Sequence, residues 1–469
     1  MYYLKKWGGI VVCKLALLFM LQNLYAERKN SVPTIGKIYD LKAGEFLIDT
    51  SVIYMPVPND ETHPSVAFDG TNYFVVWEDS RSGSTSDIYG ARVSQDGTVL
   101  DPNGIAISTA TGYQGIPSVA FDGTNYLVVW EDFRSGSYDI YGARVALDGT
   151  VLDPNGIAIS TATNDQEHPS VAFDGTNYFV VWEDSRSGST SDIYGARVSP
   201  DGTVIDQNGI AISTAPNNQE YPSVAFNGIN YLIVWEDYRS GSSDIYGARV
   251  SQDGTVLDPN GIAISTATGY QFSPSVAFDG TNYFVVWHDL RSGSTSDIYG
   301  ARVSQGGTVI DQNGIAISTA PSGQGYPSVA FDGTNYFVVW GDLRSGSTSD
   351  IYGARVSPDG TVIDQEGIAI STATSWQESP SVAFDGTNYF VVWEDLRSGP
   401  SSDIYGARVT QNGTVLDLDG ILISITTHSQ YVPSVSFDGT NYFVVWMDNR
   451  NNSYDIYGAR VSPGGFVFD

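Results

Sequence analysis

Acidic and basic side chains recur at a fixed spacing along this sequence, and they are the first candidates for chemistry. An aspartate followed two residues later by an arginine, first seen at Asp79 and Arg81, occurs eight times. These pairs could form a ring of binding groups, or each aspartate could hold its own loop by pairing with its arginine. Because one active site does not need eight copies of a pair, we favour the structural role. A second repeated pair, Asp87 and Arg92, is interpreted in the same way.

Asp79 and Asp87 also enclose a loop rich in serine and glycine, which offers oxygen ligands to calcium. Calcium takes six to eight oxygens, some of them from carboxylates. Each loop contains an arginine, however, and the spacing fits no standard calcium loop. Asp and Ser in such loops usually bond to the nearby backbone. We therefore predict no cofactor and commit to no metal, and calcium at these two aspartates stays the open alternative.

Positions that differ between the repeats are better candidates for a specific contact. Several are aromatic residues beside glutamines, and a histidine replaces a repeated glutamate after one tryptophan. A flat ring can stack on a sugar or peptide while a neighbouring amide hydrogen-bonds to it. The alternative is drift at unconstrained surface positions after duplication. The predicted binding residues are Tyr113, Gln114, Tyr238, Tyr270, Gln271, His288, Trp376 and Gln377.

Eight tryptophans set the period of the repeat at 52 or 53 residues, and we predict a structural role for them and for Asp79 and Arg81. Each unit has four short β-branched and aromatic segments, separated by Asp-Gly and other turn signals. Four antiparallel strands in such a length are typical of one propeller blade. The sequence therefore predicts an all-β, eight-bladed β-propeller. The tryptophans are Trp77, Trp130, Trp182, Trp235, Trp287, Trp340, Trp393 and Trp446.

The two ends of the repeat array indicate how the ring closes. The eighth unit stops at residues 468–469, after its third strand, and residues 44–50 look like the missing fourth strand. We expect that strand to pair into the last blade, so the propeller spans residues 44–469. The alternative, an open solenoid, needs terminal caps that we do not find. The loops between strands two and three then share a face with the variable inter-unit links, where we expect binding.

The acidic charge balance excludes some binding partners. With 53 acidic and 23 basic side chains and a net charge of -30, the chain is not expected to bind nucleic acid or anionic membranes.

The first residues predict export. Residues 1–26 combine Lys5 and Lys6, an apolar stretch and Ala26, which predicts a cleaved signal peptide rather than a membrane anchor. Residues 27–43 are a predicted linker. The single Cys13 lies in the signal, so no disulfide is expected afterwards.

The succession Pro-Ser-Val-Ala, Asp-Gly, Phe-Val-Val-Trp and Asp-Ile-Tyr-Gly-x-Arg resembles repeats in large secreted bacterial proteins, including RTX-type and adhesin-like surface chains. The resemblance covers about residue 44 to the end. It implies a bacterial, repeat-built protein of propeller type that is extracellular, periplasmic or on the cell surface. It implies no activity, and the nonapeptide calcium repeats of RTX domains are absent.

Catalytic residues give only a weak signal. The histidines at positions 63, 168, 288 and 428 lie in different units, and no Ser-His-Asp group, metal motif or phosphate loop is found. We therefore predict a secreted, monomeric, non-catalytic propeller that binds an extracellular carbohydrate or protein. One alternative is an extracellular propeller glycoside hydrolase of sialidase-like type, because such enzymes use Asp, Glu, Tyr and clustered Arg. Another is a purely structural repeat scaffold.

Overall fold

The computed structural model describes residues 46–48, 60–83, 85–293, 295–451 and 453–468. All of them belong to one compact unit, residues 41–50 together with 57–469. Across these ranges the chain forms strands and turns and no helix, so no described segment is of the kind that crosses a membrane as a helix. The predicted signal peptide, residues 1–26, and the predicted linker, residues 27–43, lie outside the described residues.

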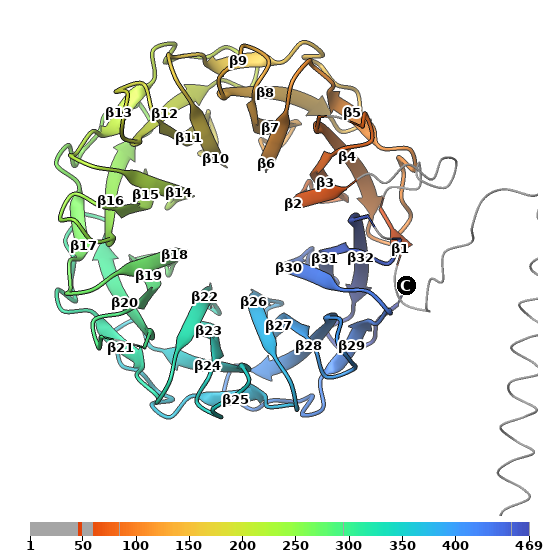
Figure 1. Cartoon of the computed structure of the whole chain (residues 1–469), viewed down its shortest axis with the longest axis vertical. Coiled ribbons are helices and arrows are strands. Elements are labelled where there is room, and N and C mark those ends of the chain that lie inside the picture. The colour runs from red at the N-terminus through yellow and green to blue at the C-terminus, as the bar shows by residue number, and fades with distance from the viewer. Residues whose placement is uncertain (1–45, 49–59, 84, 294, 452, 469) are drawn as a thin grey trace, which may run out of the picture. The chain divides into compact units, whose positions relative to one another are not determined.

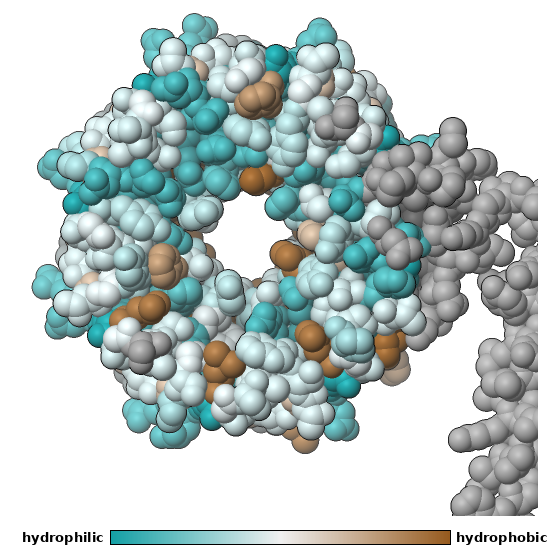
Figure 2. All heavy atoms as spheres, in the orientation of Figure 1, coloured by the Kyte–Doolittle hydropathy of each residue, from teal (hydrophilic) through white to brown (hydrophobic). Residues whose placement is uncertain are grey.

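Eight four-stranded antiparallel sheets are arranged as a ring, which confirms the predicted eight-bladed β-propeller (Figure 1). Within blade 1 the order is β2-β3-β4-β5 from the centre outward, and the other blades repeat it. The space-filling view shows that the centre of the ring stays open (Figure 2). We number the blades 1 to 8 from the innermost strands β2 to β30.

The strands have closely matched bounds in all blades. The innermost are β2 (Glu61–Phe68), β6 (Gln114–Phe121), β10 (Gln166–Phe173), β14 (Gln219–Phe226), β18 (Gln271–Phe278), β22 (Gln324–Phe331), β26 (Gln377–Phe384) and β30 (Gln430–Phe437). The second strands are β3 (Asn72–Asp79), β7 (Asn125–Asp132), β11 (Tyr178–Asp184), β15 (Asn230–Asp237), β19 (Asn282–Asp289), β23 (Tyr336–Asp342), β27 (Asn388–Asp395) and β31 (Tyr442–Asp448). The third are β4 (Asp87–Ser94), β8 (Asp139–Ala146), β12 (Asp192–Val198), β16 (Asp244–Ser251), β20 (Asp297–Ser304), β24 (Asp350–Val356), β28 (Asp403–Thr410) and β32 (Asp455–Val461). The outermost are β5 (Ile105–Ser108), β9 (Ile157–Ser160), β13 (Ile210–Ser213), β17 (Ile262–Ser265), β21 (Ile315–Ser318), β25 (Ile368–Ser371), β29 (Ile421–Ser424) and β1 (Phe46–Leu47).

The second strand of each blade is buried on both faces, because its alternating side chains meet two different neighbours. In β3, Tyr73 and Trp77 pack toward blade 8, whereas Phe74 and Val76 pack toward blade 2. The eight marker tryptophans are all fully buried. The propeller core is therefore a series of eight inter-blade clusters, each built from both of the adjoining blades.

The ring closes as expected, because β1 pairs antiparallel with β32 and completes blade 8. The amide of Ile48 donates to the carbonyl of Ile456 at 3.1 Å, and Ile48 itself is fully buried between blades 8 and 1. A side chain at Gly458 would come within 3.1 Å of the Ile48 Cδ1, so this glycine leaves the room that Ile48 fills. Two segments from opposite ends of the sequence thus form one blade.

Glu61 marks the same junction, since the other seven blades have glutamine at the corresponding position. Its carboxylate accepts a hydrogen bond from the Ile456 amide at 3.0 Å, as Gln430 does from the Ile404 amide at 3.1 Å. Burial and the neighbouring Asp79 and Asp455 raise the pKa of Glu61 well above its ordinary value. The folded protein therefore favours the neutral form of this carboxyl.

Replacing Glu61 by Gln is expected to stabilise the protein at pH 8. A carboxyl whose pKa is raised by folding holds its proton more tightly in the folded state, so it lowers stability as the pH rises above about 4.5. Glutamine stays neutral and can keep the bond to Ile456. We expect the melting temperature to rise by about 2 °C or more at pH 8 and the difference to shrink at pH 5. The converse variant, Gln324→Glu, should lower the melting temperature at pH 8. A melting temperature of Glu61→Gln equal to that of the wild type at both pH values would contradict the prediction.

Candidate functional site

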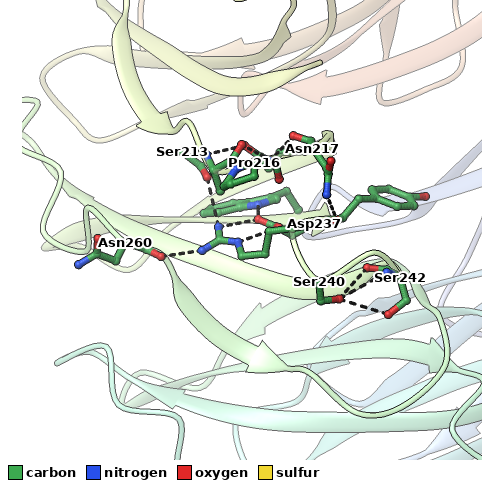
Figure 3. Close-up of polar contacts among 12 residues, drawn as sticks. Ser213, Pro216, Asn217, Asp237, Ser240, Ser242 and Asn260 are labelled. Atoms are coloured by element: carbon green, nitrogen blue, oxygen red, sulfur yellow. Dashed lines mark hydrogen bonds and ion pairs between the residues drawn. The ribbon is translucent and has the colours of Figure 1, made fainter. Parts of the chain in front are cut away.

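The repeated Asp-x-Arg pairs hold the loops after the second strands, as blade 4 illustrates (Figure 3). Asp237 is fully buried and accepts from the indole of Trp235 at 2.8 Å and from Arg239 Nε at 2.8 Å. Arg239 also donates to the carbonyl of Asn260 at 2.9 Å and stacks over the ring of Tyr246. All eight loop arginines pair with the aspartate of their own blade. They are parts of the scaffold and do not converge on one ligand.

These contacts also bear on the two candidate calcium ligands. Both oxygens of Asp79 accept from Trp77 or Arg81, and Asp87 lies buried at the start of β4. Within the described ranges no group of three or more His, Cys, Asp or Glu side chains could hold a metal ion. Calcium at this loop stays a prediction.

The expected pairing of Asp87 with Arg92 is wrong. Arg92 binds Asp101 through two hydrogen bonds of 2.8 Å, and it also donates to the carbonyl of Leu147 in the next blade. The reason is the period of a strand, because residues five apart on β4 point to opposite faces of the sheet. Arg92 therefore fastens blade 1 to blade 2.

The three glutamines predicted to contact a ligand are also wrongly placed. Gln114, Gln271 and Gln377 are fully buried, and each amide nitrogen donates to two carbonyls of the link that precedes its blade. Their amide nitrogens fold the inter-blade links, and burial keeps the side chains away from a surface ligand. The aromatic residues of the same prediction lie at the surface or partly so: Tyr270 and Trp376 are exposed, whereas Tyr113, Tyr238 and His288 are half-buried.

The loops between strands two and three and the inter-blade links share one end of the propeller, which we call the loop face. Tyr238 lies there beside Asn217 and Asn218, at a shallow depression of about 340 Å³ between blades 3 and 4. Each innermost strand begins at this face, and each second strand ends at it. The innermost strands therefore begin around the loop-face mouth of the central opening (Figure 1).

A bulge near the start of every innermost strand presents one residue at that mouth. The register with the second strand shifts there, and the bulged residue has a positive φ of 48–55° although it is never glycine. A proline always follows, and it has no amide to leave unpaired. Bulges commonly re-aim side chains beside functional sites. The eight bulge residues are His63, Ile116, His168, Tyr221, Ser273, Tyr326, Ser379 and Val432.

The residue after the marker tryptophan lies next to these bulges and is Glu in blades 1–4 and 7. The glutamate of one blade accepts from the bulge amide of the next: Glu131 from His168 at 3.3 Å, and Glu183 from Tyr221 at 2.7 Å. Blades 3, 4 and 7 add a second glutamate directly opposite on the innermost strand. Like charges in such cross-strand positions are destabilising, so the fold alone does not favour them. Blades 1–4 form the continuous part of this acidic row. We call the six residues the acid arc: Glu78, Glu131, Glu167, Glu183, Glu220 and Glu236.

Two members of the acid arc on adjacent blades have opposite environments. Glu78 is held by His63 at 3.1 Å, by the Ser86 hydroxyl at 2.8 Å and by Tyr113. Burial raises the pKa of Glu78, but these three contacts outweigh it and leave the pKa below the ordinary value. Among the described residues Glu131 accepts a hydrogen bond only from the backbone amide of His168, and burial raises its pKa to about 7. At neutral pH the site therefore holds an ionised carboxylate beside a carboxyl that can donate a proton.

Histidines complete this part of the mouth. The side chain of His63 is 54% exposed and that of His168 is 33% exposed, and His168 Nδ1 lies 3.0 Å from Glu183. The contact with Glu78 raises the pKa of His63; for His168, burial lowers the pKa, but Glu183 and other carboxylates more than compensate. Gly115 lies opposite Glu131 and has no side chain, which leaves room for the Tyr113 hydroxyl. The cluster occurs in blades 1–3 alone among the described blades.

Sequence reasoning placed His63 and His168 in different units and did not connect them. A usable signal was present, because the residue before an unchanging proline is of five different types in the eight units, unlike the nearly constant residues that follow it. What the sequence could not supply was the left-handed bulge that brings these positions to the channel mouth beside the glutamates.

No protein-family model matches the chain, and no curated protein matches it. Solved propeller structures are similar to it at low identity. A periplasmic gluconolactonase from Pseudomonas aeruginosa has 16% identity and a TM-score of 0.42, covering 71% of this chain and 92% of that one. An α-L-arabinanase from Penicillium chrysogenum has 13% identity and a TM-score of 0.39, covering 62% and 92%. A thermostable family-43 glycoside hydrolase has 14% identity and a TM-score of 0.33, covering 52% and 89%.

These three proteins are described as two glycoside hydrolases and a gluconolactonase, which goes against the predicted non-catalytic binding module and agrees better with the alternative prediction, a propeller hydrolase. At 13–16% identity the likeness itself shows the fold alone. The sialidase-like form of that alternative lacks its arginine cluster, because each loop arginine is bound within its own blade. The chemistry of this chain follows from its own residues at the channel mouth.

Proposed function

We propose that the protein is an extracellular glycoside hydrolase that acts at the acid arc, with Glu131 as general acid and Glu78 as general base. The observation that supports this proposal is the pair of carboxyl groups on adjacent blades. Three polar side chains hold Glu78, whereas Glu131 accepts from one backbone amide. Pairs of titratable groups in such contrasting environments are typical of acid–base assignments. Glycoside hydrolysis commonly uses two carboxyl groups of this kind.

In the proposed reaction, water attacks the anomeric carbon as the bond to the leaving oxygen breaks. Glu131 gives its proton to that oxygen, and Glu78 takes one proton from the water. The His63 side chain keeps Glu78 ionised and oriented. The net charge of -30 and the acid arc disfavour anionic sugars, so the substrate class is a neutral glycan. Export is supported by the predicted signal peptide and by the resemblance to secreted bacterial repeat proteins, and we propose that the chain acts as a monomer.

Purified protein should release reducing sugar from at least one neutral polysaccharide or hydrolyse a 4-nitrophenyl glycoside. A panel of arabinan, xylan, galactan and β-glucan, with the matching chromogenic glycosides, covers the class. No turnover of any of them would overturn the proposed hydrolase.

The activity should depend on pH in a way set by the two carboxyl groups. Glu131 must be protonated, so kcat/KM should fall as the pH rises through about 7. Glu78 must be ionised, so the acidic limb should lie below the ordinary glutamate value of 4.5. Initial rates between pH 3 and 9 measure both limbs. An activity that keeps rising through pH 9 would contradict these roles.

A further inference from the structure

We propose that blades 5 and 6 carry a second sugar-binding subsite, an aromatic platform on the loop face that holds a neutral glycan away from the cleavage point. The platform consists of Tyr270, Phe272, His288 and Tyr326. This inference rests on the proposed hydrolase and names how that site would hold a long substrate. In a ring of eight blades, blades 5 and 6 lie across the channel from blades 1 and 2, where the two catalytic carboxyls are (Figure 1).

The four rings form a continuous row over two blades. Tyr270 stacks on Phe272 with centroids 5.6 Å apart and planes 6° apart. Phe272 meets His288 edge-on at 5.2 Å, and His288 meets Tyr326 edge-on at 6.4 Å with the planes 85° apart. Tyr270 is 46% exposed and Tyr326 is 61% exposed, so the two ends of the row are open to a ligand. Flat exposed rings of this kind match the apolar C–H face of a sugar.

The polar groups of the platform are neutral. His288 replaces the glutamate found in five other blades, and burial lowers its pKa, so the imidazole is uncharged at pH 7. Its Nδ1 is buried and has no hydrogen-bond partner among the described residues, so the ring contributes an apolar, neutral surface to the row. In blade 6, Gly325 and Gly341 lie opposite each other where blades 3 and 4 have two glutamates. These replacements leave blades 5 and 6 without the opposed glutamates of blades 3, 4 and 7, which favours a neutral polymer over a cationic one at the platform.

The bulge explains how Tyr326 comes to be exposed. Its φ of 55° is a left-handed conformation that few large residues adopt, yet blades 5 and 7 have serine at the same bulge with φ of 52° and 53°. The fold therefore does not need a tyrosine at this position. All eight bulges share this φ, so its conformational cost belongs to the fold, and a ligand contact would account for the exposed tyrosine side chain itself.

The test is the double variant Tyr270→Ser and Tyr326→Ser, which uses the residues that this chain itself has at Ser429 and Ser379. Affinity electrophoresis in gels with arabinan, xylan, galactan or β-glucan measures binding without turnover. We expect one polysaccharide to retard the wild type and the double variant to bind it at least about 10-fold more weakly, the loss of two stacked rings. Turnover of a small 4-nitrophenyl glycoside should stay within about twofold, because such a substrate reaches only the cleavage position. The control is Ile229→Thr, which restores the repeat's usual residue at an exposed apolar position on the opposite face.

Unchanged retardation of the double variant, or no retardation of the wild type by any of the four polymers, would overturn the platform. In either case, turnover of the small glycosides would still support the proposed hydrolase activity. Retardation that depends on the two tyrosines, without turnover of any substrate, would support the platform and refute the proposed hydrolase activity.

Discussion

Replacing Glu131 by Gln is expected to lower kcat on a hydrolysed glycoside by about 100-fold or more, the usual contribution of a general acid. The amide has no proton to give the leaving oxygen at any pH. It keeps the size of the glutamate and can still accept from the His168 amide, so the local fold is retained. The alkaline limb of the pH profile, which we assign to this group, should disappear from the residual activity. Initial rates and thermal melting of the same preparation measure both effects.

The chain provides a matched control in Glu394→Gln. Glu394 follows the marker tryptophan of blade 7 as Glu131 follows that of blade 2, and it accepts from the Val432 amide at 2.9 Å. Burial raises its pKa as well. It has no histidine bulge beside it, because the neighbouring bulge residues are Ser379 and Val432. The control should keep wild-type activity; equal losses in the two variants would show that the position matters for stability and not for catalysis.

The architecture was predictable because it is repeated. A tryptophan every 52 or 53 residues and Asp-Gly turns between short β segments define a blade, and eight units define the ring. The offset at the two ends predicted the pairing of β1 with β32, which the structure confirms. Strands alternate their side chains between two faces, which is why β3 contacts both of its neighbouring blades.

The site was harder to predict because it depends on local departures from regular strands. Gln114 looked like a ligand contact because it follows a variable loop, yet its side chain is buried and holds that loop. His63 looked isolated, but the bulge brings it to Glu78, fifteen residues away in sequence. Whether a glutamate is ionised depends on its neighbours across two blades, as Glu78 and Glu131 illustrate. Such facts depend on packing, which a pattern of residue types does not contain.

Replacing Ile48 by Asp is expected to cause the largest loss of stability, because it places a charge where the ring closes. Ile48 is fully buried in the cluster that joins Tyr73 and Trp77 of blade 1 to Phe443 of blade 8. Loss of the apolar side chain and burial of a carboxylate together cost about 4 kcal/mol or more, which lowers the melting temperature by about 8 °C or more. Once β1 detaches, β32 becomes an unpaired edge, so we also expect faster amide exchange across β32 and a tendency to aggregate.

Two variants separate ring opening from a damaged core. Ile48→Val keeps the contact and should cost only about 1 kcal/mol. Ile264→Asp introduces the same charge at the equivalent position of blade 4, where the chain runs on into the next blade. It should lower the melting temperature as well, but leave amide exchange in β32 at the wild-type rate. Blade 8 alone is assembled from two distant segments, so it alone can open without a break in the chain. Exchange in β32 that responds equally to both aspartates, or a wild-type melting temperature for Ile48→Asp, would refute β1 as the closing strand.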